Sequence, residues 1–178
     1  MPALVALLGS INVGGNRLAM ADLRTTLKSA GFRNVDTVVA SGNVIFDHER
    51  PGDEALGTEI EAIVRQRFGF VSFVAVRDRD ELATCILGNP FRTDGDAKYV
   101  HTIFLEKPVA REAVERFAAG FDGAERIAGE GRELFIDYAT GVARSRIDPA
   151  LRKARLIEGR ATARNVRSLQ RILEKMDR

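Results

Sequence analysis

The sequence predicts an α+β protein made of two ferredoxin-like halves with antiparallel sheets. Over the first half, strand-like apolar runs and helix-spaced apolar positions follow one another in the order strand, helix, strand, strand, helix, strand. Over the second half a similar order begins again, without identity of sequence between the halves. The polar stretch 92–98 lies between them as a linker. We therefore expect one domain over residues 1–91 and a second, with basic C-terminal helices, over residues 98–178.

In the first half, residues 3–9 are apolar on both faces and predict a strand that is covered on both sides. A helix is expected over residues 20–30, where Met20, Leu23 and Leu27 recur at helical spacing and Gly31 ends the run. Strands are expected over residues 34–40 and 44–47, joined by a turn. A second helix over residues 53–68 and a strand over residues 71–76 complete the pattern.

In the second half, a helix over residues 79–87 leads into the linker, and residues 99–106 and 109–119 predict a strand and a helix. Residues 125–129 and 133–138 predict a hairpin. Residues 148–178 are expected to be helical, with an apolar stripe formed by Leu169, Ile172, Leu173 and Met176.

One face of a ferredoxin-like sheet carries no helices. Because residues 3–9 are apolar on both faces, that second face should be covered as well. The other half of the chain or a second subunit is the expected cover, so a homodimer is one possible assembly.

Composition predicts a packed, soluble protein. Hydrophobic residues make up 45% of the 178 residues and charged residues 29%, which is ordinary for a globular domain. Cys85 is the one cysteine, so no internal disulfide can form, and this fits a reducing, cytoplasmic compartment. The apolar start lacks a basic leader and is short, and no apolar run reaches the ~18 residues of a membrane span.

Charge is distributed unevenly along the chain. Residues 141–178 hold eleven Lys and Arg and four Asp and Glu, a net of +7, whereas residues 1–140 have a net of −5. The basic segment is either a solvated helical face or a patch for an anionic partner.

Five short motifs, in this order, carry a resemblance to a known family: Ile11-Asn12-Val13-Gly14-Gly15-Asn16, Met20-Ala21-Asp22-Leu23-Arg24, Ser41-Gly42-Asn43-Val44-Ile45-Phe46, Asn89-Pro90-Phe91 and Thr162-Ala163-Arg164-Asn165. Together they resemble the bacterial family called domain of unknown function 1697. The resemblance implies two α+β halves and no established activity, cofactor or catalytic residue. Members carry Arg-Gly before the first motif and Trp after the last Arg-Asn pair, where this chain has Gly9, Ser10 and Val166.

The strongest candidate site is the first loop, which we define as residues 9–17. Asn12, Gly14, Gly15, Asn16 and Arg17 lie between a strand and a helix, where backbone amides can surround an anion. The loop lacks the Lys and Ser/Thr of a phosphate-binding P-loop and the glycine spacing of a dinucleotide fingerprint. The alternative is a structural loop whose asparagines hold backbone groups.

Two further groups complete the candidate site. Ser41 and Asn43 belong to the expected hairpin turn, and they become ligand residues only if that turn faces the same end as the first loop. Arg144, Arg164 and Asn165 belong to the basic segment, where arginine can bind phosphate or carboxylate through two hydrogen bonds. A helix cap at Thr162 is the structural alternative for the last motif.

Few residues in the sequence could form a catalytic or metal-binding site. His48, His101 and Cys85 stand apart from one another, so neither a metal site nor a catalytic group is predicted, and no cofactor is expected. The leading hypothesis is binding of a small anionic or phosphorylated ligand in a cleft between the first loop and the C-terminal arginines. A nucleic-acid-associated module using residues 144–171 and a protein-interaction or dimerisation module are the alternatives, and whether the protein is an enzyme stays open.

Overall fold

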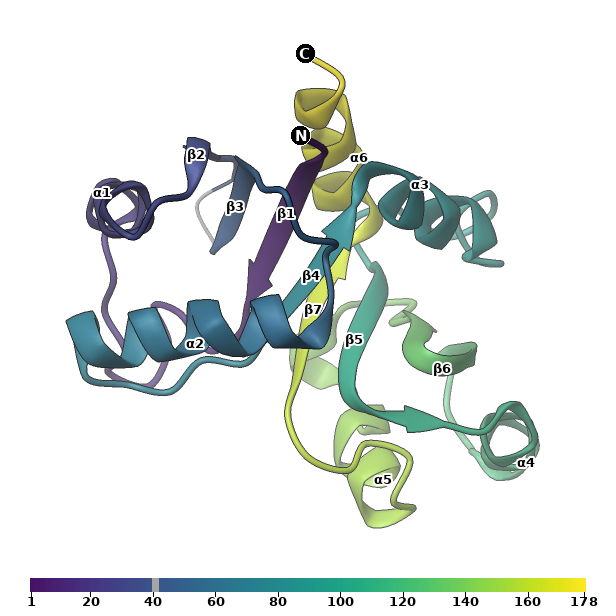
Figure 1. The fold of residues 1–178 in the computed structure, drawn as a ribbon. Helices are drawn as coiled ribbons and strands as arrows, with labels where there is room; N and C mark the ends of the chain where they lie inside the picture. Colours follow the sequence, from purple (N-terminus) through teal and green to yellow (C-terminus); the bar gives the residue numbers. More distant parts are fainter. Residues whose placement is uncertain (40–41) are drawn as a thin grey trace. The chain divides into compact units, whose positions relative to one another are not determined.

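The computed structural model describes residues 1–39 and 42–178, and the chain divides into two compact units (Figure 1). Unit 1 comprises Met1–Ala83 and Gln170–Arg178, and unit 2 comprises Thr84–Leu169. The predicted linker, residues 92–98, lies inside unit 2. No helix in the described ranges has both the length and the apolar character needed to cross a membrane.

Unit 1 contains a four-stranded antiparallel sheet with the strand order β2-β3-β1-β4. Its elements follow one another in the expected order strand, helix, strand, strand, helix, strand. They are β1 (Ala3–Leu8), α1 (Met20–Ser29), β2 (Arg33–Thr37), β3 (Asn43–Asp47), α2 (Glu54–Phe68) and β4 (Val74–Asp78). The helix α3 (Arg79–Gly88) follows β4 directly.

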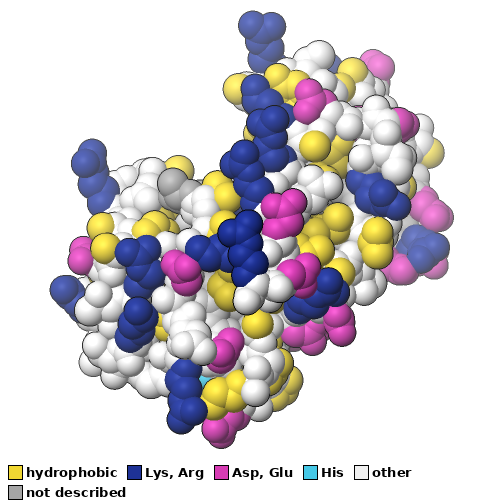
Figure 2. All heavy atoms as spheres, turned by 90° about the horizontal axis from the view of Figure 1, so that it is seen from above, with side chains coloured by type: hydrophobic (Ala, Val, Ile, Leu, Met, Phe, Trp, Pro, Cys, Tyr) yellow, Lys and Arg dark blue, Asp and Glu magenta, His cyan; other side chains and the backbone are white. Residues whose placement is uncertain are grey.

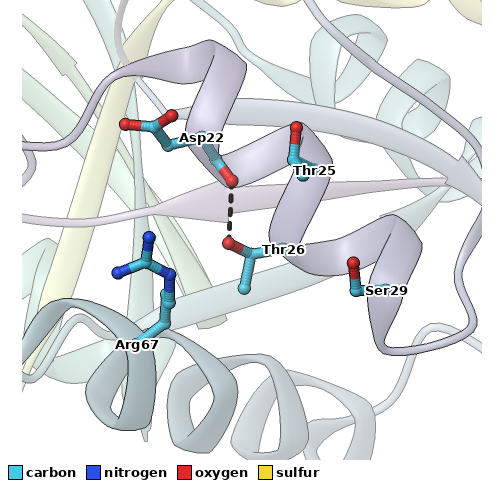
Figure 3. Close-up of a pocket in the computed structure, with 5 residues that line it drawn as sticks. All are labelled: Asp22, Thr25, Thr26, Ser29 and Arg67. Atoms are coloured by element: carbon cyan, nitrogen blue, oxygen red, sulfur yellow. Dashed lines mark hydrogen bonds between the residues drawn. The ribbon is translucent and has the colours of Figure 1, made fainter.

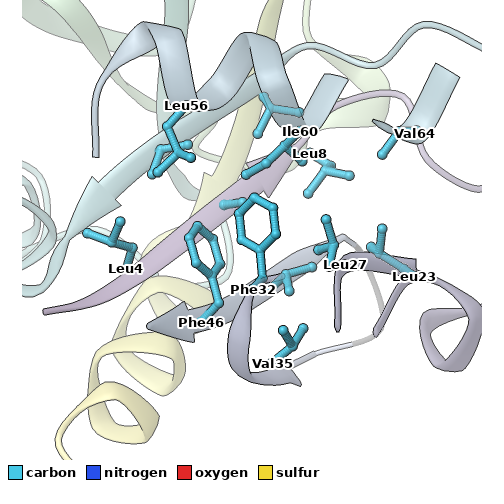
Figure 4. Close-up of a cluster of buried hydrophobic side chains, with 14 of the residues drawn as sticks. Leu4, Leu8, Leu23, Leu27, Phe32, Val35, Phe46, Leu56, Ile60 and Val64 are labelled. Atoms are coloured by element: carbon cyan, nitrogen blue, oxygen red, sulfur yellow. The ribbon is translucent and has the colours of Figure 1, made fainter. Parts of the chain in front are cut away.

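Helices α1 and α2 pack on one face of this sheet and enclose the core of unit 1 (Figure 4). The even positions of β1 point into that core, beneath side chains that recur at helical spacing on α1 and α2. Phe32 and Phe46 meet edge to face there, with their ring centroids 5.0 Å apart. Helix α2 begins at a side-chain cap, since Asp53 accepts a hydrogen bond from the amide of Leu56, and it ends at the left-handed Gly69.

The opposite face of the sheet is covered within the chain. Val5 and Leu7 of β1 point away from α1 and α2, yet each is fully buried. The C-terminal end of helix α6 (Val166–Met176) contributes to this cover, because Lys175 forms an ion pair of 2.6 Å with Asp36 of β2. The expectation of a covered second face is confirmed, and a second subunit is not needed to cover it.

Unit 2 contains a three-stranded antiparallel sheet with the strand order β6-β5-β7. Its elements are β5 (Val100–Val109), α4 (Arg111–Gly120), β6 (Arg126–Asp137), the short 3-10 helix η1 (Val142–Arg144), α5 (Ile147–Lys153) and β7 (Ala161–Asn165). The buried residues Ile147 and Leu151, one helical turn apart, anchor α5 in the core of this unit.

The element β6 folds back on itself. Arg126 donates hydrogen bonds to Asp137, eleven positions away, at 2.8 and 3.1 Å. A straight strand would separate these residues by about 35 Å at ~3.3 Å per residue. The reversal lies at Gly129 and Gly131, both with positive φ, in the place where the sequence predicts a hairpin turn.

The strand β7 corrects the sequence-based expectation, which assigned helix to the whole of residues 148–178. Residues in β7 alternate between the two faces of the sheet, but the two buried positions are Thr162 and Arg164. An apolar alternation is therefore absent, and periodicity could not identify the strand. The helix begins only at Val166, so a cap at Thr162 is also wrong.

Candidate functional site

The first loop is held by its own hydrogen bonds. The side chain of Asn12 accepts a hydrogen bond from the amide of Leu18 at 3.0 Å and donates one to the Leu18 carbonyl at 3.2 Å. The side chain of Asn16 donates to the carbonyl of Ser10 at 3.2 Å, and the Asn16 carbonyl accepts from the amide of Asn12 at 2.7 Å. These contacts give both asparagines a structural task, and a direct role in ligand binding stays a prediction for each.

The tip of the first loop presents backbone donors to solvent. Val13, Gly14 and Gly15 are exposed, and no acceptor among the described residues takes a hydrogen bond from their amides. Gly14 and Gly15 have φ of +57° and +90°, and a Cβ on either would meet no atom within 4 Å. Conformation rather than close packing therefore explains these two glycines. The exposed Arg17 follows two residues later.

Gly42 and the start of β3 lie beside the first loop at one end of unit 1. The amide of Leu8 donates to the carbonyl of Gly42 at 2.9 Å, and Asn43 lies opposite Leu7 in the sheet. Asn43 is fully buried and its side chain donates to the carbonyl of Val38 at 3.0 Å, which is a structural contact. Ser41 lies outside the described residues.

The segment that precedes β4 is the third part of the chain at this end of unit 1. Ser72 is buried and its hydroxyl donates to the carbonyl of Gly9 at 2.6 Å, while the amide of Gly9 donates to the carbonyl of Phe73 at 2.8 Å. Residues 9–17, Gly42 and residues 72–73 thus meet at the end of unit 1 where β1 leaves the sheet.

Two of the three predicted C-terminal site residues have structural partners in unit 2. Arg164 is buried in β7 and donates to the hydroxyl of Thr162 at 2.8 Å and to the carbonyl of Ala163 at 2.7 Å. Burial lowers the pKa of Arg164 to about 10, so its guanidinium is still charged at neutral pH. Asn165 caps α6, because its side-chain oxygen accepts a hydrogen bond from the amide of Ser168 at 2.9 Å.

Arg144, the third residue, is exposed on η1 and belongs to a group of cations around α5 that we call the α5 basic cluster. Its members are Arg144, Arg146, Arg152, Lys153 and Arg155. All five are exposed, and none forms an ion pair within 4.0 Å in the part of the chain that the structure describes. Arg152 donates to the carbonyl of Gly159, and the charge of Arg146 contributes to lowering the pKa of Glu125, chiefly a result of the hydrogen bond from Ser145.

Three other arginines of unit 2 are neutralised by carboxylates. Arg111 binds Glu130 through two hydrogen bonds, and Arg160 binds Glu106 at 2.8 Å. Arg126 lies between Asp94 and Asp137 with its guanidinium 4.7 Å from the ring centre of Phe91. Basic side chains are numerous and interspersed with acidic ones on the face shown in Figure 2. The α5 basic cluster differs from these three arginines in that none of its cations has a carboxylate within 4.0 Å among the described residues.

A pocket of about 210 Å³ lies between α1 and α2 in unit 1. Asp22, Thr25, Thr26 and Ser29 of α1 line it together with Arg67 of α2, whose guanidinium points toward α1 in Figure 3. The hydroxyls of Thr25 and Thr26 are engaged with carbonyls one helical turn earlier. None of the predicted site residues lines this pocket. Its two walls, α1 and α2, lie far apart in the sequence, so no single sequence motif predicts it.

A second polar group lies beneath α5 in unit 2. The ring of His101 meets that of Tyr138 edge-on at 5.0 Å, and the Tyr138 hydroxyl donates to Asp148 at 2.8 Å. Burial lowers the pKa of His101 and raises the pKa of Tyr138. The hydroxyl of Ser145 donates to Glu125 and accepts from the amide of Ile147, which fixes the start of α5. These bonds hold the helix that carries the basic cluster.

The residues predicted to form one cleft belong to different units: Asn12 lies in unit 1 and Arg164 in unit 2. A cleft shared by the two thus stays a prediction. Arg152, Lys153 and Arg155 lie within the predicted basic range 144–171 but were not singled out as site residues, although their density around one short helix was a signal. Within the described residues, no group of three His, Cys, Asp or Glu is placed to hold a metal ion.

Comparison with known proteins gives a family and a fold but no activity. The solved structure of a conserved bacterial protein from Streptococcus pneumoniae is similar, with a TM-score of 0.75, 17% sequence identity and coverage of 100% of this chain and 99% of the other. No curated protein matches the chain. Residues 1–135 match the family described as "Protein of unknown function (DUF1697)". Since that match covers most of the chain, the protein belongs to the DUF1697 family.

Proposed function

We propose that the protein binds a small anionic or phosphorylated ligand at the tip of the first loop. The observation that carries this proposal is the row of exposed amides at Val13, Gly14 and Gly15, which have no acceptor among the described residues. Consecutive amides that point outward form a concave donor site for an anion, as in other nest-like loops. Arg17, exposed nearby, supplies a positive charge.

The internal bonds of the loop support this role. Ser10 and Asn12 have positive φ, at 55° and 59°, which costs free energy for residues other than glycine. The side chains of Asn12 and Asn16 hold this conformation, so the amides are already oriented before a ligand arrives. Preorganisation of this kind lowers the entropy lost on binding.

Titration with inorganic phosphate, followed by amide resonances, tests the proposal. Saturable shifts at Val13, Gly14 and Gly15 that weaken in Arg17→Gln support it. Arg65→Gln is the matched control, because Arg65 is also exposed in unit 1 but lies in the last turn of α2. Shifts that do not saturate, or that weaken equally in both variants, would show that the loop is scaffold.

A second candidate function is association with nucleic acid through the basic C-terminal segment. The α5 basic cluster favours it, since these five cations have no carboxylate within ion-pair distance in the described part. Protein interaction or dimerisation stays a further alternative, although Val5 and Leu7 on the second face of the sheet in unit 1 are already buried in the single chain. A cytoplasmic location belongs to the same proposal and is supported by the sequence, whose single cysteine allows no internal disulfide.

We infer further that both units are ferredoxin-like. Unit 1 has that element order and the strand order β2-β3-β1-β4. In unit 2, β6 turned back at Gly129 and Gly131 supplies two strands, and β7 supplies the last one. A solution structure that resolved two paired segments within β6 would test this assignment.

A further inference from the structure

We propose that the α5 basic cluster binds the phosphate backbone of double-stranded nucleic acid without regard to sequence. This inference rests on the second candidate function and specifies the partner and the residues. It depends on the charges of side chains and not on the dipole of the short helix.

The composition of the cluster favours phosphate. Four of its five cations are arginine, whose planar guanidinium can donate two parallel hydrogen bonds to phosphate oxygens. Two carboxylates around α5 are hydrogen-bonded to hydroxyls, because Asp148 accepts from Tyr138 and Glu125 accepts from Ser145. Among the described residues no carboxylate lies within 4.0 Å of a cation of the cluster, so each of these cations can still form an ion pair with an external anion.

The spacing of the cluster favours an extended anion. Arg144 and Arg146 precede α5, whereas Arg152, Lys153 and Arg155 lie at or beyond its last turn. A helix of this length extends about 10 Å at 1.5 Å per residue, so one phosphate cannot contact both ends. The same distance is close to the ~12 Å width of the major groove of a DNA duplex, so the two ends can reach phosphates on both sides of a groove.

The surroundings of the cluster disfavour single strands. Proteins that bind single-stranded nucleic acid use exposed aromatic rings on which bases stack. Tyr138, the aromatic residue beneath α5, is 3% exposed. Among the described residues, the large hydrophobic side chains that are exposed include no aromatic ring. Backbone contacts to a duplex remain as the mode of binding that these side chains can provide.

The position of α5 is fixed firmly enough to present the charges. Ile147 and Leu151 of α5 are fully buried, and the hydrogen bonds from Ser145 to Glu125 and from Tyr138 to Asp148 join the start of α5 to the residues that flank β6. Replacing exposed cations should therefore leave the fold intact.

The test is fluorescence anisotropy of the full chain with a short DNA duplex of mixed sequence, its separate strands, and polyglutamate as competitor. We expect the duplex to bind more tightly than either strand at low salt. The double variant Arg144→Gln/Arg155→Gln should weaken duplex binding about tenfold. It should also reduce the slope of log affinity against log salt by roughly 2, or ~0.9 for each phosphate that the variant no longer neutralises. Arg116→Gln is the matched control, since Arg116 is exposed on α4 of the same unit and lies outside the cluster.

Each outcome decides a separate point. No binding to any nucleic acid at low salt would overturn both the second candidate function and this inference. If the protein prefers single strands and the double variant still binds them more weakly than the parent, the assignment to duplex is wrong, but association with nucleic acid through the cluster is supported. An equal effect of Arg116→Gln would remove the cluster as the binding surface. Polyglutamate competing as well as the duplex would overturn the assignment to nucleic acid, because an acidic peptide would then satisfy the same cations.

Discussion

Arg126 and Asp137, at the two ends of β6, are joined by a hydrogen bond of 2.8 Å from the guanidinium to the carboxylate. The contact requires the chain to reverse between them, at Gly129 and Gly131. A Cβ on Gly129 would fall on the carbonyl oxygen of Glu133, whereas one on Gly131 would meet no atom within 4 Å. The two glycines therefore serve the same turn for different reasons.

Replacement of each glycine by alanine tests this turn. Gly129→Ala combines a φ of +136° with a backbone clash, and we expect it to destabilise unit 2 by several kcal/mol. Gly131→Ala imposes only the left-handed conformation, at a cost of about 1–2 kcal/mol. Urea denaturation measures both values. Equal costs would mean that Gly129 does not approach the opposite segment of β6.

The cap of α6 gives a second prediction. Asn165→Ala removes the acceptor for the Ser168 amide and should cost about 1 kcal/mol, which lowers the melting temperature by roughly 2–4 °C. Asn165→Asp keeps the acceptor and loses only the weaker bond from the amide nitrogen to the Lys98 carbonyl at 3.3 Å. It should therefore retain most of the stability. If Asn165→Asp lowers the melting temperature as much as Asn165→Ala does, Asn165 does not act as a cap.

The buried His101 should make stability fall with acidification. Burial lowers its pKa in the folded protein, although the contact with the Tyr99 carbonyl and, to a smaller extent, the charge of Asp148 oppose this effect. The unfolded chain takes up a proton below about pH 6.5, but folded His101 does so only at lower pH. Stability is thus highest above that value and declines as pH falls through it toward the folded pKa.

His101→Phe removes the titrating group and keeps a ring against Tyr138. The free energy of unfolding of the variant should fall less than that of the parent between about pH 7.5 and about pH 5.5. Urea denaturation at these pH values gives the comparison. The parent and the variant losing equal stability would show that another group controls the transition.

The sequence allowed the strand and helix order of unit 1 to be predicted because its apolar positions repeat at the periods of strands and helices. The helix face of β1 and the buried positions of α1 and α2 follow from that repeat alone. The strand β7 could not be predicted, because its inward positions are Thr162 and Arg164. A strand is recognised in a sequence by alternating apolar residues, and this alternation is missing where the buried positions are polar.

The candidate site was predicted in part. Glycine and asparagine between a strand and a helix indicated the first loop correctly as a loop, with left-handed residues at Asn12, Gly14 and Gly15. The partners of the asparagine side chains are backbone atoms of Ser10 and Leu18, and residue identity does not encode such contacts. For the same reason the sequence could not separate arginines that form ion pairs, such as Arg160, from those around α5, for which the described residues provide no carboxylate within 4.0 Å.

The two faces of β1 give the last prediction. Leu8 points toward α1 and α2, Leu7 points to the opposite face, and both are at most 1% exposed in the single chain. Leu7→Ala and Leu8→Ala should therefore each cost about 2–5 kcal/mol, as in other buried leucine truncations. Urea denaturation at several protein concentrations provides the measurement. Because the cover over Leu7 belongs to the same chain, the midpoint for Leu7→Ala should not change with concentration. A midpoint that rises with protein concentration would instead mean that a second subunit contributes to the cover.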